Sequence, residues 1–191
     1  MLDAVMHQDL QRGYSMDLPP WKELAPIFAV LSPIFVLLLS GLWLNKSLEK
    51  LKSRLQLNHA IIQKRADTYA EIQEDLNSIY SYIKRVGNWK ALTPMDILEY
   101  KRKVDQKIHS TRPYWSKDML NNYNDFMKTC FVTNRGHKID AGIVAEVDKY
   151  KRLDSWNGDF EMHFDGIFNE ATLDNANDNF MSALSKDFGV E

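Results

Sequence analysis

An uncharged apolar stretch from Leu24 to Asn45 constrains this chain more than any other feature of its sequence. A helix of about 20 apolar residues is long enough to cross the roughly 30 Å hydrocarbon core of a bilayer. Trp21 and Trp43 lie near the two ends of the stretch, where indole rings favour the headgroup region, and Pro33 is expected to kink the helix. The stretch therefore predicts a transmembrane helix over residues 24–45, with Trp21, Pro33 and Trp43 as membrane-anchor residues.

Two other interpretations of this stretch fit the flanking residues less well. The segment before it is acidic, whereas a signal peptide begins with a basic region, and no A-x-A-like cleavage site follows it. A buried helix that is apolar on every side needs a larger protein around it than 191 residues provide. Because Lys and Arg are concentrated after the stretch, the positive-inside rule predicts a short extracytoplasmic N-terminus over residues 1–23 and a cytoplasmic C-terminal part.

A seven-residue repeat follows the apolar stretch, and no Gly or Pro interrupts the chain from Leu42 to Val86. Its alternating three- and four-residue spacing predicts one long stalk helix over residues 46–86. In one interpretation the seam pairs with another copy in a coiled coil, and Asn58 and Arg65 fix its register. In the other it packs against later helices of the same chain, which leaves both residues near solvent. The stalk-seam residues are Leu48, Leu51, Leu55, Asn58, Ile62, Arg65, Tyr69, Ile72 and Leu76.

Residues 87–191 are predicted to form a cytosolic helical domain with an acidic C-terminal end. Gly87 and Asn88 break the stalk helix, Thr93 is placed as the N-cap of a helix to about His109, and Ser116 as the N-cap of the next. Further helices are expected over residues 143–153 and 175–187. The predicted fold class is all-α: a single N-terminal transmembrane helix that continues into a long stalk helix, with a cytosolic helical bundle.

The sequence contains no recognisable catalytic, cofactor-binding or metal-binding motif. No two of its 5 histidines lie four residues apart on a helix, and it lacks a glycine-rich phosphate loop. His137 and His163 have carboxylates nearby, an arrangement that surface loops often produce by chance. The single Cys130 lies in a helix-like run and is expected to be buried. We therefore predict a non-enzymatic protein with no cofactor, no metal and no small-molecule substrate.

The net charge of −2 conceals a basic middle and an acidic end. The basic residues after the apolar stretch are expected to contact anionic headgroups, and a second basic group lies among aromatic residues that favour RNA or phosphate. More often such a group is a solvated face beside core aromatics. The candidate partner or headgroup contacts are Lys46, Lys50, Lys52, Arg54, Lys101, Arg102 and Lys103.

The apolar N-terminal segment is followed by "ADTYAEIQEDLNSIYSYIKRVGNWKALTPMDILEYKRKVDQKIHSTRPYWS" and a helical "NNYNDFMKTCF". Over residues 20–131 this architecture resembles the small bacterial membrane effectors that are encoded beside retron reverse transcriptases in anti-phage defence. The resemblance implies an effector that a reverse transcriptase and its RNA–DNA hybrid keep silent, and that perturbs the inner membrane once released.

These observations predict a toxin-like, membrane-anchored effector of antiviral defence, located in the bacterial inner membrane as a single-pass protein with its N-terminus outside. Its expected partners are the lipid bilayer, further copies of itself, and a cytosolic protein or reverse transcriptase–RNA/DNA complex. The alternative is a bitopic scaffold or signalling adaptor that tethers a cytosolic complex to the membrane.

Overall fold

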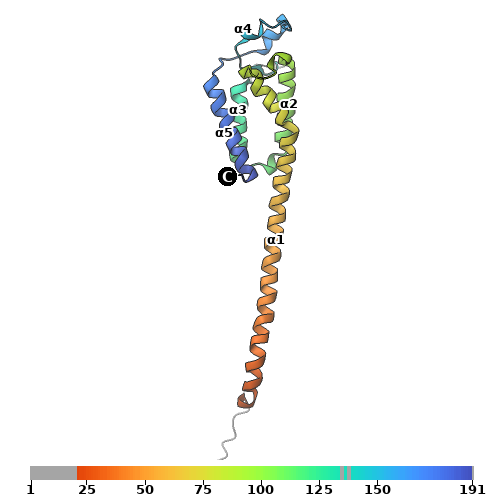
Figure 1. The fold of residues 1–191 in the computed structure, drawn as a ribbon, viewed down its shortest axis with the longest axis vertical. Coiled ribbons are helices and arrows are strands. Elements are labelled where there is room, and N and C mark those ends of the chain that lie inside the picture. Colours follow the sequence, from red (N-terminus) through yellow and green to blue (C-terminus); the bar gives the residue numbers. More distant parts are fainter. Residues whose placement is uncertain (1–20, 134–135, 137–138, 191) are drawn as a thin grey trace, which may run out of the picture. The chain divides into compact units, whose positions relative to one another are not determined.

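The computed structural model describes residues 21–133, 136 and 139–190, and 76% helix against 3% strand makes the fold all-α (Figure 1). The chain divides into two compact units, Met1–Leu55 and Gln56–Glu191. The first helix, α1, covers Trp21–Lys84 and supplies residues to both units. Within the first unit the described residues are all helical.

The second unit is a helical bundle with a small sheet. After α1 come η2 (Trp89–Ala91), α2 (Pro94–Ser110), η3 (Arg112–Tyr114) and α3 (Lys117–Cys130). They are followed by β1 (Phe131–Val132), β2 (Gly142–Ile143), α4 (Val147–Tyr150), η4 (Gly158–His163) and α5 (Glu170–Phe188). Figure 1 shows α3 and α5 side by side in this unit, where they pack closely against one another.

The apolar core of the bundle lies between α1, α2, α3 and α5. From α1 it takes Ile72, Leu76, Ile79 and Ile83, which are spaced three or four residues apart and therefore lie on one helix face. The other three helices supply matching apolar faces, so that the second unit has a core of its own. The fully buried side chains from these helices include Ile97, Val104, Ile108, Met119, Tyr123, Phe126 and Phe180.

Local sequence signals fix the helix ends in the bundle. The Thr93 hydroxyl accepts a hydrogen bond from the Asp96 backbone N–H, and the Asp96 carboxylate accepts one from the Thr93 N–H at 2.8 Å, which completes a capping box with Pro94 in the first turn. Ser116 caps α3 by accepting from the Met119 N–H at 3.0 Å. The predictions of Thr93 and Ser116 as N-caps are confirmed.

α1 ends where the sequence predicts a break, through two residues in the left-handed region. Arg85 has φ of 61° and Gly87 has φ of 62°. Glycine adopts this conformation freely, whereas a residue with a Cβ needs other contacts to hold it there. The Arg85 Nη1 group donates to Glu146 Oε2 at 2.7 Å, which fixes the turn against the loop before α4 and lowers the pKa of Glu146.

Two element predictions differ from the structure. The helix expected over residues 143–153 is only α4 (Val147–Tyr150), because Gly142 and Ile143 pair with Val132 and Phe131 in an antiparallel sheet. Ile143 also bridges Phe164 in parallel. The last helix begins at Glu170 and not at residue 175, because the Asn169 side chain caps it by accepting from the Thr172 N–H at 3.0 Å.

Candidate functional site

Large apolar side chains are exposed along the part of α1 that belongs to the first unit. Phe35, Val36 and Leu37 are 62–71% exposed, and Leu42 and Trp43 are 69% and 72% exposed. Monomeric proteins rarely expose contiguous apolar surface of this extent unless it binds something. We call the exposed apolar residues of the first unit the apolar surface of α1: Leu31, Phe35, Val36, Leu37, Leu39, Leu42, Trp43, Leu44, Leu48, Leu51 and Leu55.

The predicted membrane span over residues 24–45 is corrected by the structure. Among the residues it describes, no helix has both the length and the apolar character that a bilayer crossing requires. The prediction of a single-pass protein in the bacterial inner membrane, with its N-terminus outside, is wrong on this finding.

The three predicted anchor residues lie in α1. Pro33 is exposed within the helix, and Trp43 is one of the most exposed large side chains on it. Trp21 is the first residue of α1. The N-terminal segment over residues 1–23 falls almost wholly outside the described residues, as does His137.

The predicted stalk seam divides into an exposed and a buried part. In the first unit Leu48, Leu51 and Leu55 are 53–60% exposed. In the second unit Asn58 is exposed and Ile62 is 38% exposed, whereas Ile72 and Leu76 are 3% and 2% exposed. Tyr69 is partly buried against the core. From Ile72 onward the seam therefore packs within the chain.

Arg65 lies in the second unit, where the seam becomes buried, and it joins three parts of the bundle. Its Nε donates to the Tyr114 carbonyl at 2.6 Å, its Nη1 donates to the Asp187 carbonyl, and its Nη2 lies 3.7 Å from Asp187 Oδ2. The Asp187 side chain, 7% exposed, also accepts the Ser116 N–H at 2.8 Å. Arg65 thus holds the C-terminal end of α5 and the start of α3 against α1.

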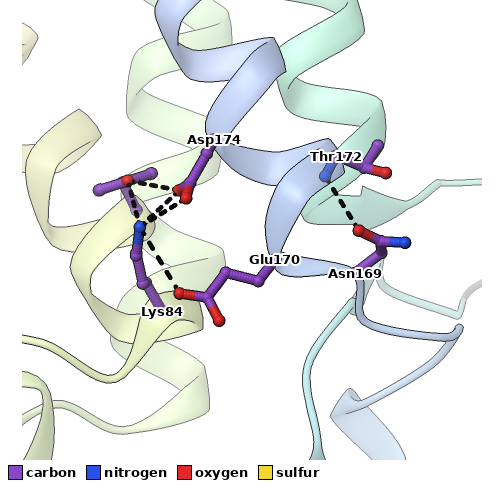
Figure 2. Close-up of polar contacts among 6 residues, drawn as sticks. Lys84, Asn169, Glu170, Thr172 and Asp174 are labelled. Carbon is purple, nitrogen blue, oxygen red and sulfur yellow. Dashed lines mark hydrogen bonds and ion pairs between the residues drawn. The ribbon is translucent and has the colours of Figure 1, made fainter.

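A second polar cluster holds the other end of α5 (Figure 2). Lys84 Nζ donates to both carboxylate oxygens of Asp174 at 2.7 Å and lies 3.7 Å from Glu170 Oε1. The Tyr80 hydroxyl donates to Asp174 at 2.7 Å and accepts from Lys84 at 3.2 Å. The bond to Asp174 raises the pKa of Lys84, and the same bond lowers the pKa of Asp174.

The two groups of predicted basic contacts have different surroundings. Lys46, Lys50, Lys52 and Arg54 are all exposed on the first unit, with Glu49 among them. The second group pairs within the bundle. Lys101 Nζ lies 2.5 Å from Asp105, Lys103 Nζ lies 3.0 Å from Glu99, and Arg102 pairs with Asp140.

The described residues contain no group of three or more His, Cys, Asp or Glu side chains placed to hold a metal ion. Cys130 is fully buried, and this burial raises the pKa of its thiol, so the reactive thiolate is disfavoured. Burial and Asp105, which accepts from the Tyr123 hydroxyl at 2.6 Å, likewise raise the pKa of Tyr123.

An open groove of about 290 Å³ lies between α1 and α2 in the second unit. Ile72 forms its apolar floor, and charged residues of both signs line its walls. Glu71 and Lys107 form an ion pair across it, and burial raises the pKa of Asp75. This mixture of charges suits a polar protein surface better than a single charged ligand. The lining also includes Lys103, Gln106 and Ser110.

The sequence gives no signal for Asp187 or Asp174 as partners of α1, because each lies in an unremarkable acidic segment far along the chain from the residue it binds. Comparison with known proteins identifies no matching family, no matching characterised protein and no matching solved structure.

Proposed function

We propose that this chain is a non-enzymatic, toxin-like effector. It acts by binding its target through the apolar surface of α1, and a partner that binds the helical bundle controls this activity. The observation that carries the proposal is the exposure of large apolar side chains such as Leu37, Leu42 and Trp43, each more than two-thirds exposed. Leaving such side chains in water is unfavourable, at about 25 cal/mol per Å² of apolar area, so covering them provides a strong driving force for association.

The bundle supports the regulatory half of the proposal. Its buried side-chain polar atoms all have hydrogen-bond partners within the described residues, which is typical of a folded domain that binds through its surface. The architectural resemblance to retron-associated effectors supports a reverse transcriptase–RNA/DNA complex as the controlling partner. The exposed Lys50, Lys52 and Arg54, which belong to the first unit and not to the bundle, favour an additional contact with an anionic partner of this kind.

Inducible expression in a bacterial host tests the effector proposal. The wild-type chain is expected to arrest growth and to depolarise cells that carry a membrane-potential dye. A variant that combines Phe35→Ser, Leu37→Ser and Trp43→Ser should lose this activity, because it removes exposed apolar area. The matched control combines Ile167→Ser and Val190→Ser, two side chains that are 94% and 76% exposed on the second unit, and should remain toxic. If cells that express the wild-type chain stay polarised and keep growing, the proposal is contradicted.

A scaffold or adaptor is the second candidate function, and the groove between α1 and α2 favours it. Glu71 and Asp75 make its α1 edge acidic, and Lys103 and Lys107 make its α2 edge basic, the kind of surface that selects a complementary protein partner. An adaptor predicts no toxicity and a stable complex on affinity capture. The complex should weaken with Lys103→Glu, whereas Lys128→Glu, which lies outside the groove, should leave it intact.

A further inference from the structure

Four leucines form an unpartnered row in the first unit. Leu44, Leu48, Leu51 and Leu55 follow one another at intervals of four, three and four residues, which places them along one side of α1. Their exposed fractions are 55%, 53%, 54% and 60%. We call this row the leucine seam. No other described residue of the first unit covers these four side chains.

We infer that the leucine seam pairs with the leucine seam of a second copy of this chain, in parallel and in register. The inference rests on the proposed function: it names a second copy of the chain as the molecule that covers part of the apolar surface of α1. Alternating three- and four-residue spacing is the pattern that another helix fills by knobs-into-holes packing. A second copy presents the same spacing over the same length, so every leucine of one seam meets a leucine of the other.

The next seam position supports this register. Asn58 follows Leu55 in the repeat and is exposed. A carboxamide both donates and accepts hydrogen bonds, so two Asn58 side chains facing one another satisfy each other, whereas a shifted register places each against leucine. A single polar residue of this type fixes register and oligomeric state in parallel coiled coils.

The size of the seam sets the expected affinity. From Leu44 to Leu55 it extends about 16 Å at 1.5 Å per residue, and two helices in contact over that length bury at most a few hundred Å² on each copy. Stable interfaces begin at about 600 Å² on each partner, so we expect reversible association that depends on protein concentration.

Charge distinguishes self-association from binding to an anionic partner. Lys46 and Lys50 are exposed on faces of α1 that point away from the seam, whereas Lys52 and Arg54 are exposed on its two flanks. A parallel pair brings Lys52 and Arg54 of one copy near those of the other, so salt should strengthen self-association by screening their repulsion. Binding to nucleic acid or to an anionic vesicle should weaken as salt is raised.

Sedimentation equilibrium of the full chain tests the inference at about 50 mM and about 500 mM NaCl. The seam variant combines Leu48→Gln and Leu55→Gln. The control combines Leu42→Gln and Leu57→Gln, two exposed leucines outside the seam that are 69% and 62% exposed. Wild type and control should form dimers, more strongly at high salt, and the seam variant should be at least tenfold weaker. Circular dichroism should show equal helix content in all three, because every substituted side chain is more than half exposed.

Cross-linking tests the orientation. With oxidised glutathione as the oxidant, Leu51→Cys should give a disulfide-linked dimer, because identical seam positions meet only in a parallel, in-register pair. Lys50→Cys, which is adjacent to Leu51 in the sequence but on another face of α1, should stay monomeric. The native Cys130 is buried and contributes no background.

Three results would overturn the inference: a wild-type monomer at both salt concentrations, equal loss of association in the seam and control variants, or no cross-link at residue 51. If the protein is a monomer and still arrests growth, or binds anionic vesicles of phosphatidylglycerol, then a second copy does not cover the seam, and the proposed effector function is unaffected. Dimers without toxicity would reject the effector function and leave the seam pairing intact.

Discussion

At the residue scale, Arg65 and Asp187 form the most consequential polar contact in the bundle. Asp187 is 7% exposed and accepts the Ser116 N–H at 2.8 Å, so two groups depend on its carboxylate. The sequence suggested two roles for Arg65, to fix the register of a coiled coil or to lie near solvent, and the structure gives it a third. Arg65 connects α1 to the last residue of η3 and to the C-terminal end of α5.

Replacing Asp187 should therefore destabilise the bundle. Asp187→Ala leaves the Ser116 N–H without its acceptor and removes the ion pair with Arg65 Nη2, and an unsatisfied buried group costs about 1–3 kcal/mol. Urea unfolding monitored by circular dichroism measures the free energy of unfolding. The control is Asp125→Ala, whose ion pair with Lys128 is largely exposed and should contribute less than about 1 kcal/mol. Equal effects of the two substitutions would contradict this role for Asp187.

Asp174 should give the bundle a distinct sensitivity to acid. Hydrogen bonds from Lys84 and Tyr80 lower the pKa of Asp174 below its ordinary value of 3.8. A carboxylate with a lowered pKa stabilises the folded state above that ordinary value, and the stabilisation is lost as the pH falls through the folded-state pKa. Asp174→Asn should therefore flatten the dependence of unfolding free energy on pH below about 4.

Urea titrations from neutral pH down to that acidic range check this expectation. Asp178→Asn, an exposed aspartate on the same helix, serves as the control and should keep the wild-type slope. A wild-type slope in the Asp174→Asn protein would mean that the contact with Lys84 does not contribute to acid stability.

At the scale of single elements, the start of α2 depends on its capping box. Thr93 accepts from the Asp96 N–H and its own N–H donates to the Asp96 carboxylate. Removing an N-cap side chain costs about 1 kcal/mol, so Thr93→Ala should lower the unfolding free energy by roughly that amount. Thr93→Ser keeps the hydroxyl and should restore most of the stability. Thermal unfolding midpoints of the three proteins distinguish loss of the cap from loss of the methyl group.

The elements also show which features the sequence could reveal. The caps at Thr93 and Ser116 were predictable because they depend on residues three positions apart. The strands β1 and β2 were not, because two-residue strands are defined by partners across a loop and not by any local pattern. The seam spacing marks one face of the helix, but the same spacing continues through an exposed part and a buried part, so it could not distinguish the surroundings of Leu51 from those of Ile72.

The polar contacts of the candidate site were harder still to predict. Arg65 and Asp187 lie 122 residues apart in the chain, and Lys84 and Asp174 lie 90 apart. Charge pairing over such separations has no signature in composition or periodicity. Only the folded bundle, which brings the two ends of α5 against α1, makes these pairs visible.

At the scale of the whole molecule, the division into two units makes a prediction about folding. The apolar core of the bundle begins at Ile72 among the described residues, and the Arg65 and Lys84 clusters lie entirely within Gln56–Glu191. Since none of the described residues of the first unit belongs to the core, a chain that begins at Gln56 should retain the bundle.

We expect this fragment to unfold cooperatively, with a midpoint within a few degrees of that of the bundle in the full chain. A loss of 1 kcal/mol would shift the midpoint by about 2–8 °C for domains in this size range, so the comparison detects a small contribution from the first unit. The fragment lacks the apolar surface of α1, so it should also be monomeric and non-toxic. Circular dichroism melts of both proteins measure the midpoints. A non-cooperative melt would show that residues before Gln56 are needed for folding, because the buried core alone would then not suffice.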